Sequence, residues 1–460
     1  MAAGRKGGVP KPPWSSDEML ALGDRAVGLA QARGAGQSEA FLAWGVSTSV
    51  DIEGGRISYP MVSRAAGISI RVIKGGRLGF AYCTHPDMLE RTVDRALEIS
   101  RLGKALPVGF PGRAPMPSPK GIFDGRVLEL LPEEGMRIAT AIISEARSVD
   151  RSIQVTGGGV DFGFSEAALV NSGGLAHCEK GTAVSAGASV TLKGRTTSTG
   201  FDSQSGRSLP ADLPALGGTA ARLAVASQNP VAIGTGKLPV VFTPEAAAEL
   251  LGPVLLPALE GESAGRGESV YSGRLGQPVM DAGLTIADDG LLDGGLGTSA
   301  CDDEGVPSGR NVLVENGVLR AFMYDLYTAA EFGARTTGNG ARGSYRSPPS
   351  VSERNLVLEG ALRDREAVIG EIREGILVHE VLGAHTANRV SGDFSVNAPL
   401  LFRIKDGEVG RPLKPVMLSG NLPELLKHVG GLGRDRKQMG SGAGALITGS
   451  VMIDGVMVTG

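Results

Sequence analysis

The residues best placed to do chemistry lie in one stretch, GILVHEVLGAHTANRVSGDFSV, which runs from Gly375 to Val396. His379 is followed directly by Glu380, and a second histidine, His385, lies six positions after the first. Two imidazoles can hold a zinc ion while a neighbouring carboxylate activates the bound water for hydrolysis. The stretch therefore suggests a metal-dependent hydrolase as a hypothesis.

The spacing of the two histidines does not suit a helical zinc site. Two ligands on one helix share a face when they are four residues apart. A separation of six residues rotates the second ring by about 600°, which leaves it a third of a turn away from the first. The apolar run before His379 favours a strand entering at that residue, and only a break near Gly383 would let both rings converge. A third ligand is also needed; no cysteine follows, and Asp393 suits a turn equally well.

The segment SGDFSV is a candidate substrate-binding stretch. Gly392 permits close approach of another backbone, and Asp393 and Ser395 can hydrogen-bond to neighbouring backbone groups. Side chains of these types often bond only within their own turn. A purely structural role is therefore an equal alternative.

Other kinds of catalytic or binding site have little support in the sequence. The glycine-rich loop TTGNGARGSYR lacks the Gly-Lys-Ser/Thr ending of a phosphate-binding loop. No Gly-x-Ser-x-Gly motif of a serine hydrolase is present. The three remaining histidines stand alone, so neither nucleotide binding nor serine hydrolysis is a leading interpretation.

The composition indicates a globular protein of more than one domain. The chain has 460 residues and a formal net charge of −3, which favours neither a nucleic-acid partner nor a membrane surface. Its three cysteines show no CxxC pairing, as is typical of a reduced cytosolic protein. Residues 1–14 are predicted to be a flexible tail, because no apolar run of a signal peptide follows their basic residues. We therefore expect a cytoplasmic protein.

The order of predicted elements indicates an α+β fold. A helix capped by Ser15 or Ser16 precedes two strand pairs that turn at Gly54-Gly55 and Gly75-Gly76. We predict an N-terminal α+β module over residues 15–105 and a second module with antiparallel strands over 106–230. Residues 231–460 open with a strand and an apolar helix and continue mostly as strands and tight turns, which predicts a β-rich domain.

Motifs along nearly the whole chain resemble the TldD/PmbA family, and more specifically its PmbA branch, also called TldE. The segments that carry the resemblance are GAGQSEAFLAWGVSTSVDIEGGRIS, GISIRVIKGGRLGFA, ALVNSGG, CDDEGVPSGRNVLVENGVLRAFMYDLYTA, TGNGARGSYRSPPSVSERNLVLEG, GAHTANRVSGDFSV and LSGNLPELLKHV.

The resemblance implies N-terminal α/β-type modules followed by a β-rich, peptidase-like C-terminal domain. In the TldD branch this domain carries H-E-x-x-x-H, and a cysteine near the C-terminus completes the zinc site. TldD and TldE are expected to form a heterodimer that degrades or trims unfolded and precursor peptides, in which TldE is the non-catalytic subunit.

This sequence departs from the catalytic pattern. Its two histidines have one residue too many between them, and the segment KQMGSGAGALITGSVMIDG has serine and glycine where a ligand cysteine is needed. The resemblance thus implies no catalytic or metal-binding residue in this chain, with zinc held by a TldD-like partner and Gly392, Asp393 and Ser395 lining the peptide cleft. A homodimer is an expected form in the absence of that partner.

Two alternatives remain at this point. One is a self-sufficient metallopeptidase, with His379 and His385 as ligands, Glu380 as general base and an unidentified third ligand. The other is a regulator of DNA gyrase, as the family's historical naming suggests, although the near-neutral charge gives it no support.

Overall fold

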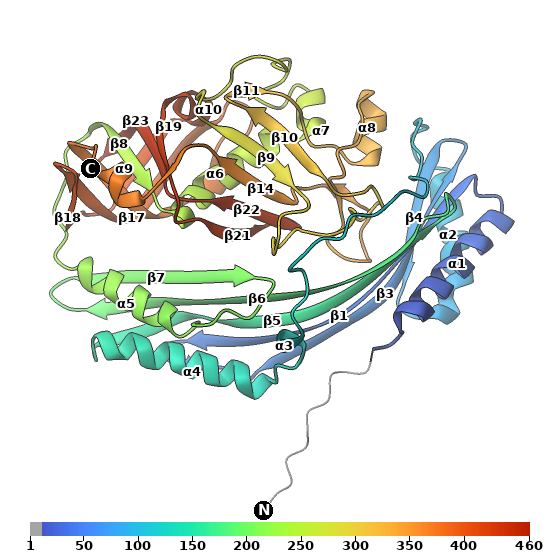
Figure 1. The fold of residues 1–460 in the computed structure, drawn as a ribbon, viewed down its shortest axis with the longest axis horizontal. Coiled ribbons are helices and arrows are strands. Elements are labelled where there is room, and N and C mark those ends of the chain that lie inside the picture. The colour runs from blue at the N-terminus through green and yellow to red at the C-terminus, as the bar shows by residue number, and fades with distance from the viewer. Residues whose placement is uncertain (1–11) are drawn as a thin grey trace, which may run out of the picture.

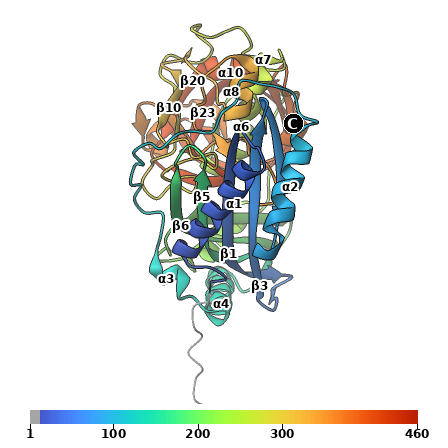
Figure 2. The same cartoon turned by 90° about the vertical axis from the view of Figure 1, so that its right-hand side faces the viewer.

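The structure of the chain, a computed structural model, describes residues 12–460. A long curved sheet forms the N-terminal half, and the C-terminal domain lies against the sheet's concave face (Figure 1). Helices cover the opposite face, and the view from the side shows the same three layers (Figure 2). Most of the predicted flexible tail, residues 1–11, lies outside the described residues.

The N-terminal sheet has seven strands in the order β4-β3-β1-β5-β6-β7, with β2 paired to β1, and all neighbours are antiparallel. Its strands are β1 Gln37–Glu53, β2 Arg56–Ile57, β3 Met61–Lys74, β4 Arg77–Cys83, β5 Ile153–Asn171, β6 Ala176–Lys193 and β7 Thr197–Gly206. Its helices are α1 Ser16–Ala32, η1 Pro86–Met88, α2 Leu89–Ser100, α3 Gly125–Leu128, α4 Pro132–Val149 and α5 Ala215–Ala226.

Local sequence signals explain where these elements begin and turn. Helix α1 starts with a capping box, in which Ser15 Oγ accepts the Glu18 N–H and Glu18 Oε2 accepts the Ser15 N–H. The predicted glycine turns are confirmed: Gly54-Gly55 joins β1 to β2 and Gly75-Gly76 joins β3 to β4. All four glycines have positive φ, as tight hairpins require.

The two predicted N-terminal modules share this one sheet. Strand β5, from the second module, pairs with β1, from the first, in a ladder that runs from Glu39–Asn171 to Asp51–Gly159. Helices α1 and α2 bury one hydrophobic cluster at one end of the sheet, and α4 and α5 bury another at the other end. The concave face is thereby left for contact with the C-terminal domain.

The C-terminal domain contains an eight-stranded sheet, a six-stranded sheet and a short two-stranded one. Its strands are β8 Gly236–Phe242, β9 Thr285–Asp289, β10 Arg310–Glu315, β11 Val318–Leu319, β12 Gly340–Ala341, β13 Ser350–Val351, β14 Asn355–Glu359, β15 Leu362–Arg363, β16 Glu374–Leu382, β17 Asp393–Lys405, β18 Glu408–Pro412, β19 Val416–Asn421, β20 Val429–Gly433, β21 Lys437–Ser441, β22 Gly444–Thr448 and β23 Val451–Thr459. Its helices are α6 Pro244–Ala258, α7 Gly261–Gly265, α8 Leu326–Phe332, α9 Arg365–Ile369, η2 Ala384–Thr386, α10 Leu422–Leu425 and η3 Leu426–His428.

Part of the larger sheet closes on itself. Strand β8 pairs with β16 on one side and with β23 on the other, so β8, β16, β17, β19 and β23 form a ring. The apolar face of α6 packs into the main hydrophobic core of this domain. The mixed α+β fold with mostly antiparallel sheets agrees with the sequence prediction. No helix within residues 12–460 is both long and apolar enough to cross a membrane.

Candidate functional site

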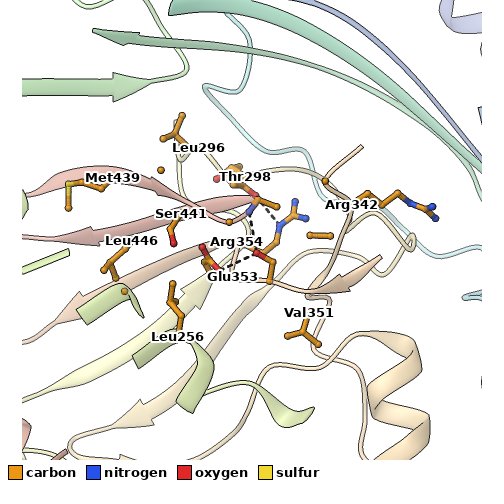
Figure 3. A pocket seen from close by; sticks show the side chains of 18 of the residues that line it. Leu256, Leu296, Thr298, Arg342, Val351, Glu353, Arg354, Met439, Ser441 and Leu446 are labelled. Carbon is orange, nitrogen blue, oxygen red and sulfur yellow. Dashed lines mark hydrogen bonds between the residues drawn. The ribbon is translucent and has the colours of Figure 1, made fainter. Parts of the chain in front are cut away.

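The main candidate site is a cavity of about 1410 Å³ between the concave face of the N-terminal sheet and the C-terminal domain. Strands β5, β6 and β7 line it on one side, while helix α6 and strand β21 line it on the other. A cavity this large exceeds what a single drug-sized molecule needs. Several residues from the C-terminal domain point into it (Figure 3).

One face of α6 forms a wall of the cavity. Glu245, Glu249, Pro253 and Pro257 recur every four residues and line it, and Glu260 continues the row just beyond the helix. The opposite face of the helix is apolar and buried. This split between two faces is the pattern of an amphipathic helix whose less apolar side meets a solvent-filled space.

The carboxyl groups of this wall are perturbed by their surroundings. Burial raises the pKa of Glu249 to about 7, against the hydrogen bond that its Oε2 accepts from the Val381 N–H at 2.8 Å. Burial also raises the pKa of Glu260 to about 7, and the nearby charge of Glu353 adds to this effect. Burial likewise raises the pKa of Glu353. Carboxyl groups that line a cavity and have a pKa raised by burial are functional-site candidates.

The wall formed by the N-terminal sheet carries polar groups from β6. His177 and Glu179 line the cavity from this strand, and Glu179 Oε1 accepts the Ala300 N–H at 3.0 Å. The Nε2 atom of His177 has no hydrogen-bond partner among the described residues. Arg207, just past β7, donates to the carbonyls of Gly295 and Leu296 and so ties a loop of the C-terminal domain to the sheet.

A buried ionic cluster holds the two halves together beside the cavity. Glu39 on β1 accepts two hydrogen bonds of 2.8 Å from Arg71 on β3 and one of 2.5 Å from Arg342 of the C-terminal domain. Arg71 also pairs with Glu304 of the C-terminal domain at 2.5 Å. All four side chains are almost fully buried, so the cluster fixes how the sheet faces the domain.

Three family models match the chain: PmbA/TldA metallopeptidase domain 1 over residues 38–100, the central domain over 126–228 and the C-terminal domain over 235–460. The chain belongs to the PmbA/TldD metallopeptidase family. The predicted resemblance is thereby confirmed.

Relatives support the same assignment. An uncharacterized protein of Methanocaldococcus jannaschii is 32% identical over 92% of this chain and 96% of its own length. A metalloprotease of Methanothermobacter thermautotrophicus is 30% identical over 85% of this chain and 86% of its own length. The crystal structure of TldE from Thermococcus kodakarensis superposes with a TM-score of 0.88 at 27% identity and covers 95% of this chain and 99% of that one.

Membership of a metallopeptidase family raises the question of whether this chain can hold zinc. Within residues 12–460, no group of three or more His, Cys, Asp or Glu side chains is arranged to hold a metal ion. Residues Met439–Ala443, which lie in the segment where the family resemblance calls for a ligand cysteine, do line the cavity, but they offer only Ser441 as a polar side chain. The residues present therefore do not fit a zinc site of the usual ligand set.

The structure separates the residues of the first candidate motif. His379 lies on β16, as the apolar run before it predicted, and its ring packs edge-on against Phe402 at 5.5 Å between centroids. Burial lowers the pKa of His379 to about 4. Neither His379 nor Glu380 lines the cavity, whereas His385, beyond the positive-φ residue Gly383, is exposed at its edge. Gly383 does break the strand with a left-handed backbone, but within residues 12–460 His379 and His385 belong to no group that could hold a metal ion.

The predicted substrate-binding residues lie at the start of β17 and are not among the residues that line the cavity. Asp393 accepts hydrogen bonds from Ser391 Oγ at 2.6 Å and from Asn421 Nδ2 at 2.9 Å, which also lower its pKa. Gly392 has φ of +79°, and the ring of Pro423 occupies the space that a side chain would need. Ser395 is exposed. These contacts fix the turn, and substrate binding by Gly392, Asp393 and Ser395 stays a prediction.

The cavity wall on α6 was not predicted from the sequence. The signal was present in PEAAAELLGPVLLPALEG, where glutamates and prolines interrupt an otherwise apolar helix at intervals of about one turn. The helix itself was predicted, but the exposure of its polar face to a cavity was not. Nothing local to the sequence indicated that the N-terminal sheet lies opposite it.

Proposed function

We propose that this chain is the non-catalytic subunit of a two-subunit zinc metallopeptidase and holds an unfolded or precursor peptide for a TldD-like partner. The supporting observation is a peptide-sized cavity whose described residues do not form a zinc-binding set. The similarity of the fold to the crystal structure of TldE from Thermococcus kodakarensis supports placing the chain in the TldE branch, from which this role is inferred.

The cavity offers an extended peptide a way to bind through its backbone. Strand β21 is an edge strand of the six-stranded sheet, and its residues Met439, Gly440 and Ser441 line the cavity. A free strand edge presents N–H and C=O groups that a peptide can pair with by adding a strand. Such pairing is independent of peptide sequence, as trimming of unfolded peptides requires.

The test measures zinc and activity on the same preparations. The chain purified alone should hold well under one zinc per chain and should not hydrolyse an unstructured peptide. Hydrolysis should appear when a TldD-type subunit is added. A stoichiometric zinc in the chain alone, lost on His379→Ala or His385→Ala, would overturn the proposal in favour of a self-sufficient metallopeptidase.

Assembly provides a separate test. Without a TldD-type partner we expect the chain to self-associate, and with the partner we expect a heteromeric complex. Light scattering at micromolar concentration measures both. A monomer that stays monomeric when the partner is added would contradict a shared peptide cleft.

A further inference from the structure

The C-terminal end of α6 gathers negative charge at the cavity. Glu260 follows directly after the last residue of the helix and its C-cap, Leu259. The C-terminal end of a helix carries partial negative charge, so a carboxylate is unfavourable there. Glu260 is also the N-cap of the short helix α7, but its side chain makes no capping hydrogen bond there, so its carboxylate remains available at the cavity wall.

The two prolines inside α6 add to this negative potential. Proline has no N–H, so Pro253 cannot bond to the carbonyl of Glu249, and Pro257 cannot bond to that of Pro253. Glu249, Pro253 and Pro257 all line the cavity. Two backbone carbonyls thus lose their usual helical donors on the cavity side of the helix.

Glu353 supplies an independent observation that points to a ligand. It lines the cavity, its residue is only 5% exposed, and its Oε1 has no geometrically defined hydrogen bond among the described residues, although the nearby hydroxyl of Ser441 lowers the pKa of this carboxyl group. Its Oε2 accepts the hydroxyl of Ser352 at 3.1 Å. Figure 3 shows the carboxylate beside Ser441 at the cavity wall. Buried acceptors left open in native proteins are rare, and each calls for an explanation such as a bound group.

Neighbouring cations in the described part of the chain do not pair with Glu249, Glu260 or Glu353. Within residues 12–460, none of Glu249, Glu260 and Glu353 makes an ion pair. Lys437 is held by Asp202 and Glu245. The guanidinium of Arg354 is held by Gly297 and Ser299. Arg389, whose charge lowers the pKa of Glu260, is an exposed residue at the cavity edge.

The arrangement of the described acidic side chains does not suit a metal ion, which favours an organic cation. No three acidic side chains among the described residues are arranged to hold a metal. A protonated primary amine carries three N–H donors and can bridge acceptors that are too far apart to coordinate one ion. Peptides carry such amines at the N-terminus and on lysine side chains.

We propose that the wall formed by Glu249, Glu260 and Glu353 is a subsite that binds a protonated primary amine of a peptide lying in the cavity. This inference rests on the proposed peptide-holding function and specifies which peptides are held best. Glu353 and Glu260 accept hydrogen bonds from the ammonium group, and the carbonyls of Glu249 and Pro253, which lack their usual helical donors, add to the negative potential around it.

The experiment compares short unstructured peptides of Ala, Gly and Ser with amidated C-termini, by calorimetry on the full chain alone and with a TldD-type subunit. One peptide has a free N-terminus, a second is N-acetylated, a third is N-acetylated with one central lysine, and a fourth has norleucine in place of that lysine. The variants are Glu353→Gln and Glu260→Gln. Glu262→Gln is the matched control, because Glu262 pairs with Arg266 and does not line the cavity.

Wild type and Glu262→Gln should bind at least one amine-bearing peptide about ten-fold more tightly than its amine-free analogue, as charge-assisted hydrogen bonds predict. The preference should fall to near unity in Glu353→Gln or Glu260→Gln, with amine-free binding and melting temperature retained. The first peptide pair reports an N-terminal amine and the second a lysine.

Three results would overturn the subsite. Equal binding of all four peptides by wild type would remove it while leaving the peptide-holding function intact. No binding of any peptide, alone or with the partner, would remove both. Saturable binding of calcium or zinc, lost in Glu353→Gln, would reassign the wall to a metal ion. Since either glutamine variant can carry the test, misfolding of one leaves it decisive.

Discussion

Replacing Glu39 by glutamine removes one charge from the ionic cluster that joins the two halves of the chain. Glu39 is fully buried and accepts hydrogen bonds from Arg71 at 2.8 Å and from Arg342 at 2.5 Å. Glutamine has nearly the same shape, but it is neutral and turns an N–H₂ group toward guanidinium donors. Arg342 would then lose its only ion-pair partner among the described residues while remaining buried.

The size of the effect follows from this burial. Removing one partner of a buried pair leaves an uncompensated charge and costs about 3–5 kcal/mol of unfolding free energy. Glu90→Gln is the control, because its ion pair with Arg33 has side chains 57% and 29% exposed. Exposed pairs contribute about 0–1 kcal/mol. Although both variants replace a glutamate by glutamine, the loss of unfolding free energy should therefore be several-fold larger for Glu39→Gln than for Glu90→Gln.

Urea denaturation followed by far-ultraviolet circular dichroism and by tryptophan fluorescence measures this difference. Both tryptophans, Trp14 and Trp44, lie in the N-terminal half, so fluorescence reports on that half alone. We expect Glu39→Gln to lower the midpoint strongly and to separate the two transitions, because the cluster spans the interface. A loss no greater than that of Glu90→Gln, with coincident transitions, would refute the reasoning.

Three further predictions concern single positions. Gly67→Ala should lower the melting temperature because its Cβ would meet the buried ring of Tyr345, whereas Gly28→Ala, in an open position of α1, should raise it slightly; scanning calorimetry of the two variants checks the opposite signs. Glu249→Gln should stabilise the chain at pH 8 but not below pH 4.5. Burial raises the folded-state pKa of this carboxyl group to about 7, above its ordinary value of 4.5, so between these two pH values the folded chain binds more protons than the unfolded chain. The stability of the wild type therefore falls as the pH rises through that window. A melting-temperature difference that does not change with pH would contradict this. Gly392→Val should destabilise the fold whatever the role of this residue, because Gly392 has a positive φ and the ring of Pro423 fills the space that a side chain would need. Ser395→Ala, at an exposed site, is therefore the cleaner test of substrate binding. Unchanged peptide processing by the folded Ser395→Ala variant would contradict substrate binding by this segment.

Features that depend on neighbouring residues were predictable from the sequence. The capping box of α1 and the glycine hairpins at 54–55 and 75–76 involve groups only a few residues apart. Asn-Gly and Asp-Gly pairs are typical of tight hairpins, and the Asn316-Gly317 and Asp406-Gly407 turns form with positive φ at all four residues. Such short-range geometry is fixed by backbone sterics and local hydrogen bonds, so it can be read from the sequence. The family, too, was recognisable from motifs alone.

The candidate site was not predictable in the same way. His379, Glu380 and His385 are close in the sequence, but the described residues form no metal-binding group. His379 packs against Phe402, whereas His385 is exposed at the cavity edge beyond the turn at Gly383. The charged face of α6 lines a cavity only because the N-terminal sheet lies opposite it.

What only the tertiary structure decided is the meeting of distant residues. Arg71 and Glu304 are 233 positions apart, and Glu39 and Arg342 are 303 apart, yet they form one buried cluster. The sequence by itself determined the family, the element types and their turns, because those depend on motifs and local backbone energetics. The cavity, its perturbed carboxyl groups and the buried ionic cluster beside it depend on desolvation and on charges brought together by folding. No local sequence pattern encodes desolvation or these long-range contacts.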